Sequence, residues 1–155
     1  MKSIILDTNA YSEYLAGNQN VLYSMSSVDK VYLSVIVLGE IYAGFRGGKK
    51  YLQNTEILQK FLSKPTVDIQ QVTDETAEIF GQTKHILKQA GTPIPINDVW
   101  IASQTIETGS VLVTFDSHFA KIPSLRVWNR RILDFRPEIS DFWAVTSLIN
   151  TSDFI

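Results

Sequence analysis

The chain has 155 residues and no cysteine, so we expect one domain, and disulfides, thiolate metal ligands and thiol nucleophiles are excluded. Its 14 Lys and Arg residues nearly balance its 16 Asp and Glu residues, and the formal net charge of −2 does not by itself indicate a general nucleic-acid binder. No apolar run approaches about 18 residues, and the first is cut by Asp7, so neither a signal peptide nor a membrane span is expected. A cytoplasmic location is the default expectation.

Short β-rich segments alternate with longer helical patterns, without a repeat or a linker that would mark a second domain. The predicted strands cover residues 3–6, 31–34, 67–72, 111–114 and 125–128. The predicted helices cover residues 11–15, 35–46, 51–62, 74–90 and 98–108, with Asn97 as an N-cap and Gly91 and Gly109 as stops. This order predicts an α/β fold with a parallel sheet wrapped by helices.

Four acidic residues, far apart in the sequence, lie where apolar segments begin or end. Asp7 follows the first predicted strand in LDTN, and Asp116 follows another in LVTFD. Asp98 opens the helical segment NDVWIAS, and Glu40 lies in the apolar stretch SVIVLGEIYAG. Ligands of open α/β sheets bind at the carboxyl ends of strands, so we expect these side chains to form one site.

Converging carboxylates require a cation. Two like charges about 4 Å apart repel by roughly 4 kcal/mol at an effective dielectric near 20. Hard oxygen ligands suit Mg²⁺ or Mn²⁺, whereas Zn²⁺ would normally bring Cys or His. Without the four proposed ligands, 12 of the 16 acidic residues remain against 14 basic ones, and a bound ion adds positive charge where a phosphate would approach. The net charge is therefore nearly uninformative about nucleic acid.

Each acid also has a purely structural explanation. Asp7 could be a turn or N-cap residue, and Asp98 could serve only the helix terminus. Glu40 has apolar neighbours and would need a partner, because an isolated buried charge is very costly. A structural role for all four together is not favoured. The two histidines receive no role: we interpret His118 as a solvated loop residue and His85 as part of an exposed helix face.

These motifs resemble those of the PIN-domain nucleases, and among them the VapC-type toxin ribonucleases. The likeness rests on LDTN at Asp7, Asn-Asp-x-x-Ile-Ala at Asp98 and Val-Thr-x-Asp at Asp116, and it runs from residue 1 to about 129. It implies a PIN-like three-layer sandwich with a central, mostly parallel five-stranded sheet flanked by helices. The nuclease domain would cover residues 1–136, and residues 137–155 would form an amphipathic C-terminal extension of it.

The resemblance also implies a function. The chain would be a metal-dependent endoribonuclease, in which Asp7, Glu40, Asp98 and Asp116 bind Mg²⁺ or Mn²⁺ and serve catalysis. Asn9 and Thr114 match the small polar positions that orient such carboxylates. The expected partners are an RNA substrate, a cognate antitoxin protein and a second copy of the chain in a homodimer. The residue that accepts the proton of the attacking water, Asp116 or Glu40, is left open.

Several alternatives remain beside this hypothesis. A non-cleaving PIN-like module that binds RNA or protein is the main one, although it would have no reason to keep four repelling carboxylates. Aromatic residues at helical spacing could stack on bases or pack in a core or interface: Tyr11, Tyr14, Tyr42 and Phe45. Two basic groups could contact RNA, an acidic partner or only solvent: Arg46, Lys49 and Lys50, and Arg126, Arg130 and Arg131.

Overall fold

A computed structural model describes residues 2–128 of the chain, and its centre is a sheet of five parallel strands. The strands are β1 (Ser3–Leu6), β2 (Lys30–Ser34), β3 (Val67–Gln70), β4 (Val111–Val113) and β5 (Val127–Trp128). Their order across the sheet is β3-β2-β1-β4-β5. The predicted α/β class is confirmed, and every strand pairing in the described part is parallel.

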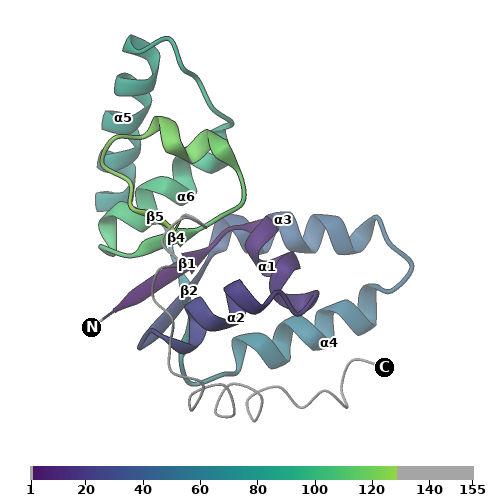
Figure 1. Cartoon of the computed structure of the whole chain (residues 1–155). Helices are drawn as coiled ribbons and strands as arrows, with labels where there is room; N and C mark the ends of the chain where they lie inside the picture. Colours follow the sequence, from purple (N-terminus) through teal and green to yellow (C-terminus); the bar gives the residue numbers. More distant parts are fainter. Residues whose placement is uncertain (1, 129–155) are drawn as a thin grey trace.

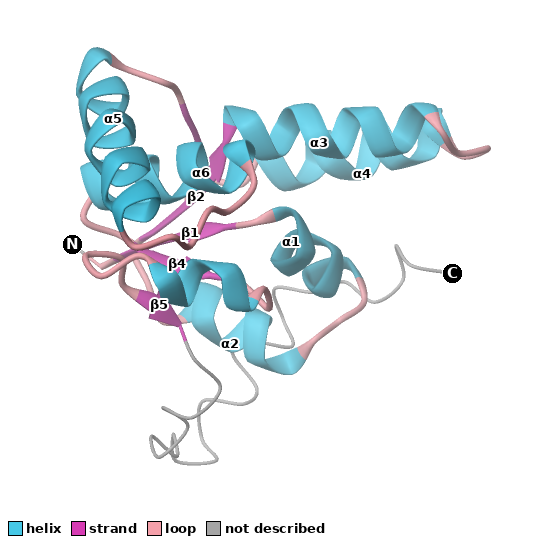
Figure 2. Cartoon of the chain, turned by 90° about the horizontal axis from the view of Figure 1, so that it is seen from above, coloured by secondary structure: helices cyan, strands magenta, loops and turns pink. Residues whose placement is uncertain are grey.

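Six α-helices form within residues 2–128, and Figures 1 and 2 show how they are arranged around the sheet. They are α1 (Thr8–Leu15), α2 (Gln19–Ser26), α3 (Val35–Arg46), α4 (Tyr51–Leu62), α5 (Asp74–Gln89) and α6 (Ile96–Glu107), and a short 3₁₀ helix, η1 (Ser117–Lys121), follows β4. In Figure 2, α5 and α6 lie on one side of the sheet and α1 and α2 on the other, while α3 and α4 run side by side and project away from it. The three-layer arrangement expected from the sequence is confirmed.

Two helices begin earlier than predicted, and one was not predicted. The helix expected from residue 11 begins at Thr8, because Asp7 caps it. The helix expected from residue 98 begins at Ile96 after Pro95, so Asn97 lies inside the first turn and is not the N-cap. Helix α2 was missed; Asn18 caps it by accepting hydrogen bonds from the second and third backbone N–H groups that follow.

The core lies on both faces of the sheet. Residues of the three central strands are completely or almost completely buried: Ile4, Ile5, Leu6, Val31, Leu33, Leu112 and Val113. Parallel strands covered on both faces read as continuous apolar runs, and the run in β1 is of this kind. Each such side chain contributes about 1.5–3 kcal/mol on burial, and the strand ends are consequently fixed in position.

A buried amide links the sheet to two helices. Ser34 Oγ donates a hydrogen bond to Oε1 of Gln104 at 2.5 Å, and Nε2 of Gln104 donates to the carbonyl oxygen of Gln70 at 2.9 Å. Ser34 ends β2 and caps α3, Gln70 ends β3, and Gln104 is a fully buried residue of α6. The starting turn of α3 is thereby held against α6 and the end of β3.

The strand order creates a topological switch point between β1 and β4. The chain moves from β1 to β2 and β3 on one side, and β4 and β5 lie on the other. The loops that leave β1 and β4 therefore separate at the carboxyl edge of the sheet, where ligands of open α/β folds bind. Between residues 2 and 128, no helix is long and apolar enough to cross a membrane. The predicted extension at residues 137–155 lies outside the described part, as do Arg130 and Arg131.

Candidate metal centre

Asp7 lies at the carboxyl end of β1 and is only 4% exposed. As the N-cap of α1 it accepts a hydrogen bond on Oδ1 from the backbone N–H of Ala10, at 2.6 Å. Its Oδ2 accepts a hydrogen bond from the hydroxyl of Thr114, which follows β4. The backbone N–H of Asp7 donates to the carbonyl oxygen of Val113 at 3.2 Å. The carboxylate is therefore fixed between the ends of two adjacent strands.

Glu40 reaches the same region from the middle of α3. Its Oε2 accepts a hydrogen bond from the hydroxyl of Thr8, and its Oε1 accepts one from Nδ2 of Asn97 at 2.9 Å. Thr8 is the neighbour of Asp7, and Asn97 is the neighbour of Asp98. Glu40 is thus held by the two residues adjacent to the other acids, which explains how a half-buried glutamate is accommodated on an apolar helix.

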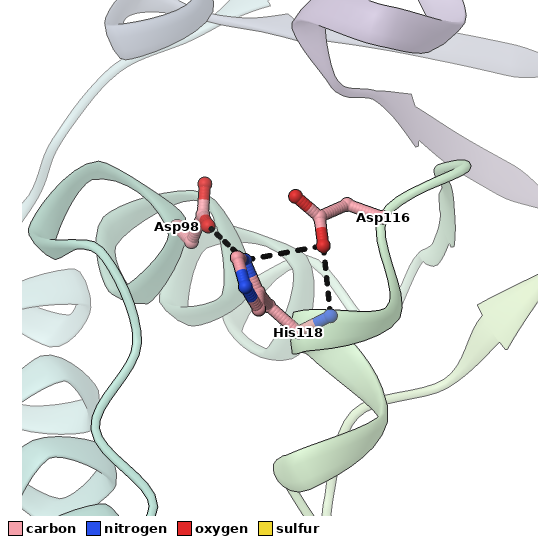
Figure 3. A group of neighbouring side chains, drawn as sticks. All are labelled: Asp98, Asp116 and His118. Carbon is pink, nitrogen blue, oxygen red and sulfur yellow. Dashed lines mark hydrogen bonds and ion pairs between the residues drawn. The ribbon is translucent and has the colours of Figure 1, made fainter.

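Asp98 and Asp116 face each other across His118 (Figure 3). Asp98 lies in the first turn of α6, and Asp116 is the N-cap of η1, where its Oδ1 accepts a hydrogen bond from the backbone N–H of His118 at 2.8 Å. The backbone N–H of Asp116 donates to the hydroxyl of Thr114 at 3.0 Å. Thr114 therefore bridges Asp7 and Asp116, the acids that follow β1 and β4.

His118 does not lie apart from the site as we interpreted it from the sequence. Its Nδ1 is 3.1 Å from Oδ1 of Asp116 and 3.6 Å from Oδ2 of Asp98. One ligand atom from each of the three side chains lies within 4.8 Å of the others. The sequence signal for this placement was the D-x-H spacing, because an Asp that caps a tight turn accepts from the N–H two residues later.

The polar residues that orient the carboxylates are only partly those predicted. Thr114 is buried and donates to Asp7, as expected. Asn9 is exposed on α1, and no hydrogen bond of its side chain is found within residues 2–128. The contacts to Glu40 come instead from Thr8 and Asn97, which the sequence analysis did not select for the site.

Burial and mutual repulsion both disfavour ionisation at this site. Burial raises the pKa of the Asp7 carboxyl, the donors Thr114 and Ala10 partly offset the rise, and the charges of Asp116 and Asp98 add to it. Burial also raises the pKa of Asp98, and so does the charge of Asp116, while His118 lowers it. The four acids therefore act on one another electrostatically, and a divalent cation would relieve their repulsion.

The donor set fits such a cation. Carboxylate oxygens are the ligands that Mg²⁺ and Mn²⁺ prefer, and Asp98 and Asp116 belong to the group whose ligand atoms lie within 4.8 Å of one another, whereas Asp7 and Glu40 do not. Asp7 and Glu40 already accept hydrogen bonds on both oxygens, but each carboxylate oxygen retains a second lone pair. Asp7 and Glu40 can therefore keep the contacts that orient them and still offer an oxygen to a cation.

The aromatic residues divide between the core and the outer layer. Tyr11 is 1% exposed and packs edge-on against Phe61 with ring centroids 5.3 Å apart, so it is a core residue and does not stack on a base. Tyr14, Tyr42 and Phe45 are half-buried and pack against the core. The guanidinium of Arg46, the last residue of α3, lies 5.1 Å from the ring centroid of Tyr51, so this basic residue has a partner within the chain.

A parallel sheet that carries four interacting carboxylates at its switch point defines an α/β protein with an acidic centre suited to a divalent cation. Residues 4–125 match the PIN domain, and the chain belongs to the PIN-domain family. It is 32% identical over 130 residues to "Ribonuclease VapC2" of Rickettsia felis, an alignment that covers 81% of this chain and 96% of that protein. A second relative is "Ribonuclease VapC1" of Haemophilus influenzae, 24% identical over 127 residues, with 79% of this chain and 93% of that protein covered.

Solved structures agree with this assignment. VapBC2 from Rickettsia felis, bound to a DNA fragment from its promoter, contains a chain that superposes with a TM-score of 0.73 at 30% identity, covering 82% of this chain and 98% of that one. VapBC-1 from nontypeable Haemophilus influenzae gives a TM-score of 0.71 at 26% identity, covering 82% and 97%. The expected resemblance to VapC-type PIN domains is confirmed.

Proposed function

We propose that this chain is a metal-dependent endoribonuclease and the toxin of a toxin–antitoxin pair. The observation that carries the proposal is the meeting of four carboxylates, from α3, α6 and the ends of β1 and β4, at one edge of the sheet. Relatives named Ribonuclease VapC support RNA as the substrate. A cytoplasmic location is part of the same proposal.

The ligands of the proposed Mg²⁺ or Mn²⁺ are Asp7, Glu40, Asp98 and Asp116. The cation, when bound, lowers the pKa of a coordinated water and offsets charge on the phosphate during in-line attack. The chain's contribution is placement: Thr114 fixes Asp7, and Thr8 and Asn97 fix Glu40. No covalent nucleophile is needed, which agrees with the absence of cysteine.

The hydrogen bonds favour Asp116 over Glu40 as the acceptor of the proton from the attacking water. Both oxygens of Glu40 already accept hydrogen bonds, from Thr8 and Asn97. Asp116 accepts on Oδ1, from the backbone N–H of His118, and within residues 2–128 no donor reaches its Oδ2. With Oδ1 of Asp116 directed to the cation, its Oδ2 would remain free beside the coordinated water, which is the position that a general base requires.

The proposed protein partners are an antitoxin and a second copy of the chain. The structural relatives are VapBC complexes from Rickettsia felis and Haemophilus influenzae, which supports an antitoxin. On this chain, Leu52 of α4 is 76% exposed, and half-buried Tyr42 and Phe45 of α3 lie in the same projecting pair of helices. Co-expression with the product of an adjacent small gene, followed by co-purification and inhibition of cleavage, tests this part.

The central test is cleavage of a mixed-sequence single-stranded RNA that carries a fluorophore and a quencher. Purified protein should cleave the RNA with Mg²⁺ or Mn²⁺, and EDTA should abolish the cleavage. The Asp98→Asn protein should be inactive. Glu56→Gln, on the exposed side of α4, is the control and should cleave normally. Equal cleavage by wild type and Asp98→Asn would indicate a contaminant. RNA binding without cleavage under all conditions would favour the non-cleaving PIN-like module.

A further inference from the structure

His118 places a ring nitrogen between two of the acids of the site (Figure 3). Its side chain is 43% exposed, yet Nδ1 is buried and forms no hydrogen bond with any group in the described part of the chain. This holds although carboxylate oxygens of Asp116 and Asp98 lie only 3.1 and 3.6 Å away (Figure 3). Both separations are ion-pair distances, so Nδ1 contacts the two carboxylates, although its orientation meets hydrogen-bond geometry with neither.

The fold fixes the backbone position of His118. The backbone N–H of His118 donates to the carboxylate of Asp116 that caps η1, so the backbone of the residue holds the same acid that its ring faces. The next residue, Phe119, is 1% exposed and anchors η1 in the core. The turn therefore holds the backbone of His118 at a position from which its ring lies between Asp98 and Asp116.

The distances suit shared coordination of one ion. In an octahedral site with bonds of about 2.0–2.2 Å, adjacent ligand atoms are about 3 Å apart and opposite ones about 4.2 Å apart. The separation of 3.1 Å from Nδ1 to Asp116 matches adjacent ligand atoms, and the 3.6 Å to Asp98 lies between the adjacent and opposite values. Imidazole nitrogen is a ligand for first-row transition cations, whereas Mg²⁺ takes oxygen.

We propose that Nδ1 of His118 is a metal ligand beside Asp98 and Asp116, and that it gives the site a preference for transition cations such as Mn²⁺ over Mg²⁺. This inference rests on the proposed function, since it needs a cation at the acidic cluster. It changes the character of the site from all-oxygen to mixed oxygen and nitrogen.

The test uses the full chain at about pH 8, where an ordinary imidazole is neutral, and follows Mn²⁺ by electron paramagnetic resonance. Free Mn²⁺ is titrated to obtain Kd, and pulsed spectra detect nitrogen bonded to the ion. Because the chain has only two histidines, His85→Asn, on the exposed surface of α5, is a matched control for His118→Asn. Competition with Mg²⁺ gives the affinity for that ion.

Wild type and His85→Asn should show the nitrogen signal and the same Kd for Mn²⁺. His118→Asn should lose the signal and bind Mn²⁺ about tenfold or more weakly, while its Mg²⁺ affinity should change by less than about threefold. Labelling wild type with ¹⁵N-histidine must change the nitrogen pattern, which tests the proposal even if the variant does not fold.

The failures of the two proposals are distinguishable. Unchanged Mn²⁺ affinity in His118→Asn, or a wild-type spectrum without histidine nitrogen, would overturn the ligand role of His118 while Asp98→Asn still lost binding. Mn²⁺ binding that is absent in wild type, or that is unaffected in Asp98→Asn, would instead remove the metal centre on which the proposed function depends.

Discussion

Replacing Asp98 by Asn should stabilise the metal-free protein while it removes the proposed activity. The variant keeps the size of the side chain and deletes one of the charges that repel one another. Ligand oxygens of Asp98 and Asp116 lie within 4.8 Å of each other, a separation at which two unit charges repel by about 3.5 kcal/mol at an effective dielectric of 20 and about 0.9 kcal/mol in bulk water. The side chains are 18% and 30% exposed, and solvent screening reduces the expected gain to about 1–2 kcal/mol.

Thermal unfolding measures this gain. In EDTA the Tm of Asp98→Asn should exceed that of wild type by about 3–8 °C for a domain of this size. Addition of Mg²⁺ or Mn²⁺ should reverse the order, because a ligand at 100 times its Kd stabilises the wild type by about 2.7 kcal/mol and the variant hardly at all. The exposed variant Glu56→Gln should follow wild type under both conditions.

Two results would refute this reasoning. If Asp98→Asn is no more stable than wild type in EDTA, then repulsion at the acidic cluster does not limit the stability of the metal-free fold. If the cation raises the Tm of both proteins equally, then Asp98 is not one of its ligands.

Three further predictions follow from the contacts around the site. The pKa of Asp98 is raised in the folded state, so the protonated side chain favours folding. The stability it provides is present below the unfolded pKa of about 3.9 and is lost as the pH rises through the folded pKa. In EDTA, the difference in Tm between Asp98→Asn and wild type should therefore be absent near pH 4 and grow toward neutral pH. Thr114→Val removes the hydroxyl that donates to Asp7 and accepts from the backbone of Asp116, and should lower the free energy of unfolding by about 1–3 kcal/mol in denaturant titrations, with a lower cleavage rate; an unchanged midpoint would contradict the bridging role. Asn97→Ala should weaken Mn²⁺ binding or cleavage by about 10–100-fold because Glu40 loses a hydrogen-bond donor. Asn9→Ala should have a much smaller effect. A larger loss in Asn9→Ala than in Asn97→Ala would support the orienting role first expected for Asn9.

The architecture could be predicted from the sequence because it depends on the order of strand and helix segments along the whole chain. The order of strands and helices predicted a parallel sheet wrapped by helices, and the continuous apolar run of β1 agrees with a strand covered on both faces. Helix α2 was not predicted because its eight residues carry only a short apolar pattern. The start of α6 was placed two residues late because Asn is a common N-cap residue, whereas the side chain of Asn97 donates to Glu40 instead.

The acids could be selected from the sequence as candidate site residues, but the hydrogen bonds that hold them could not be predicted. Asp7, Asp98 and Asp116 were recognisable by their place after strands or at a helix start. The residues that bridge them depend on which rotamer each adopts and on which turn follows, and sequence spacing does not decide this. The sequence analysis therefore selected Asn9 and not Thr8, and it interpreted His118 as a solvated residue although its ring nitrogen lies 3.1 and 3.6 Å from two acids.

The buried amide of Gln104 bears on how such a site can be controlled. Through Ser34 and Gln70 it joins the start of α3 to α6 and the sheet, so it adds a buried link, besides the Asn97–Glu40 hydrogen bond, between the helices that carry Glu40 and Asp98. Swinging either helix outward would leave polar groups of a fully buried residue unsatisfied. We therefore expect an inhibitor to act by covering the acidic residues and not by moving the two helices apart. Release of the inhibitor should then restore activity without refolding.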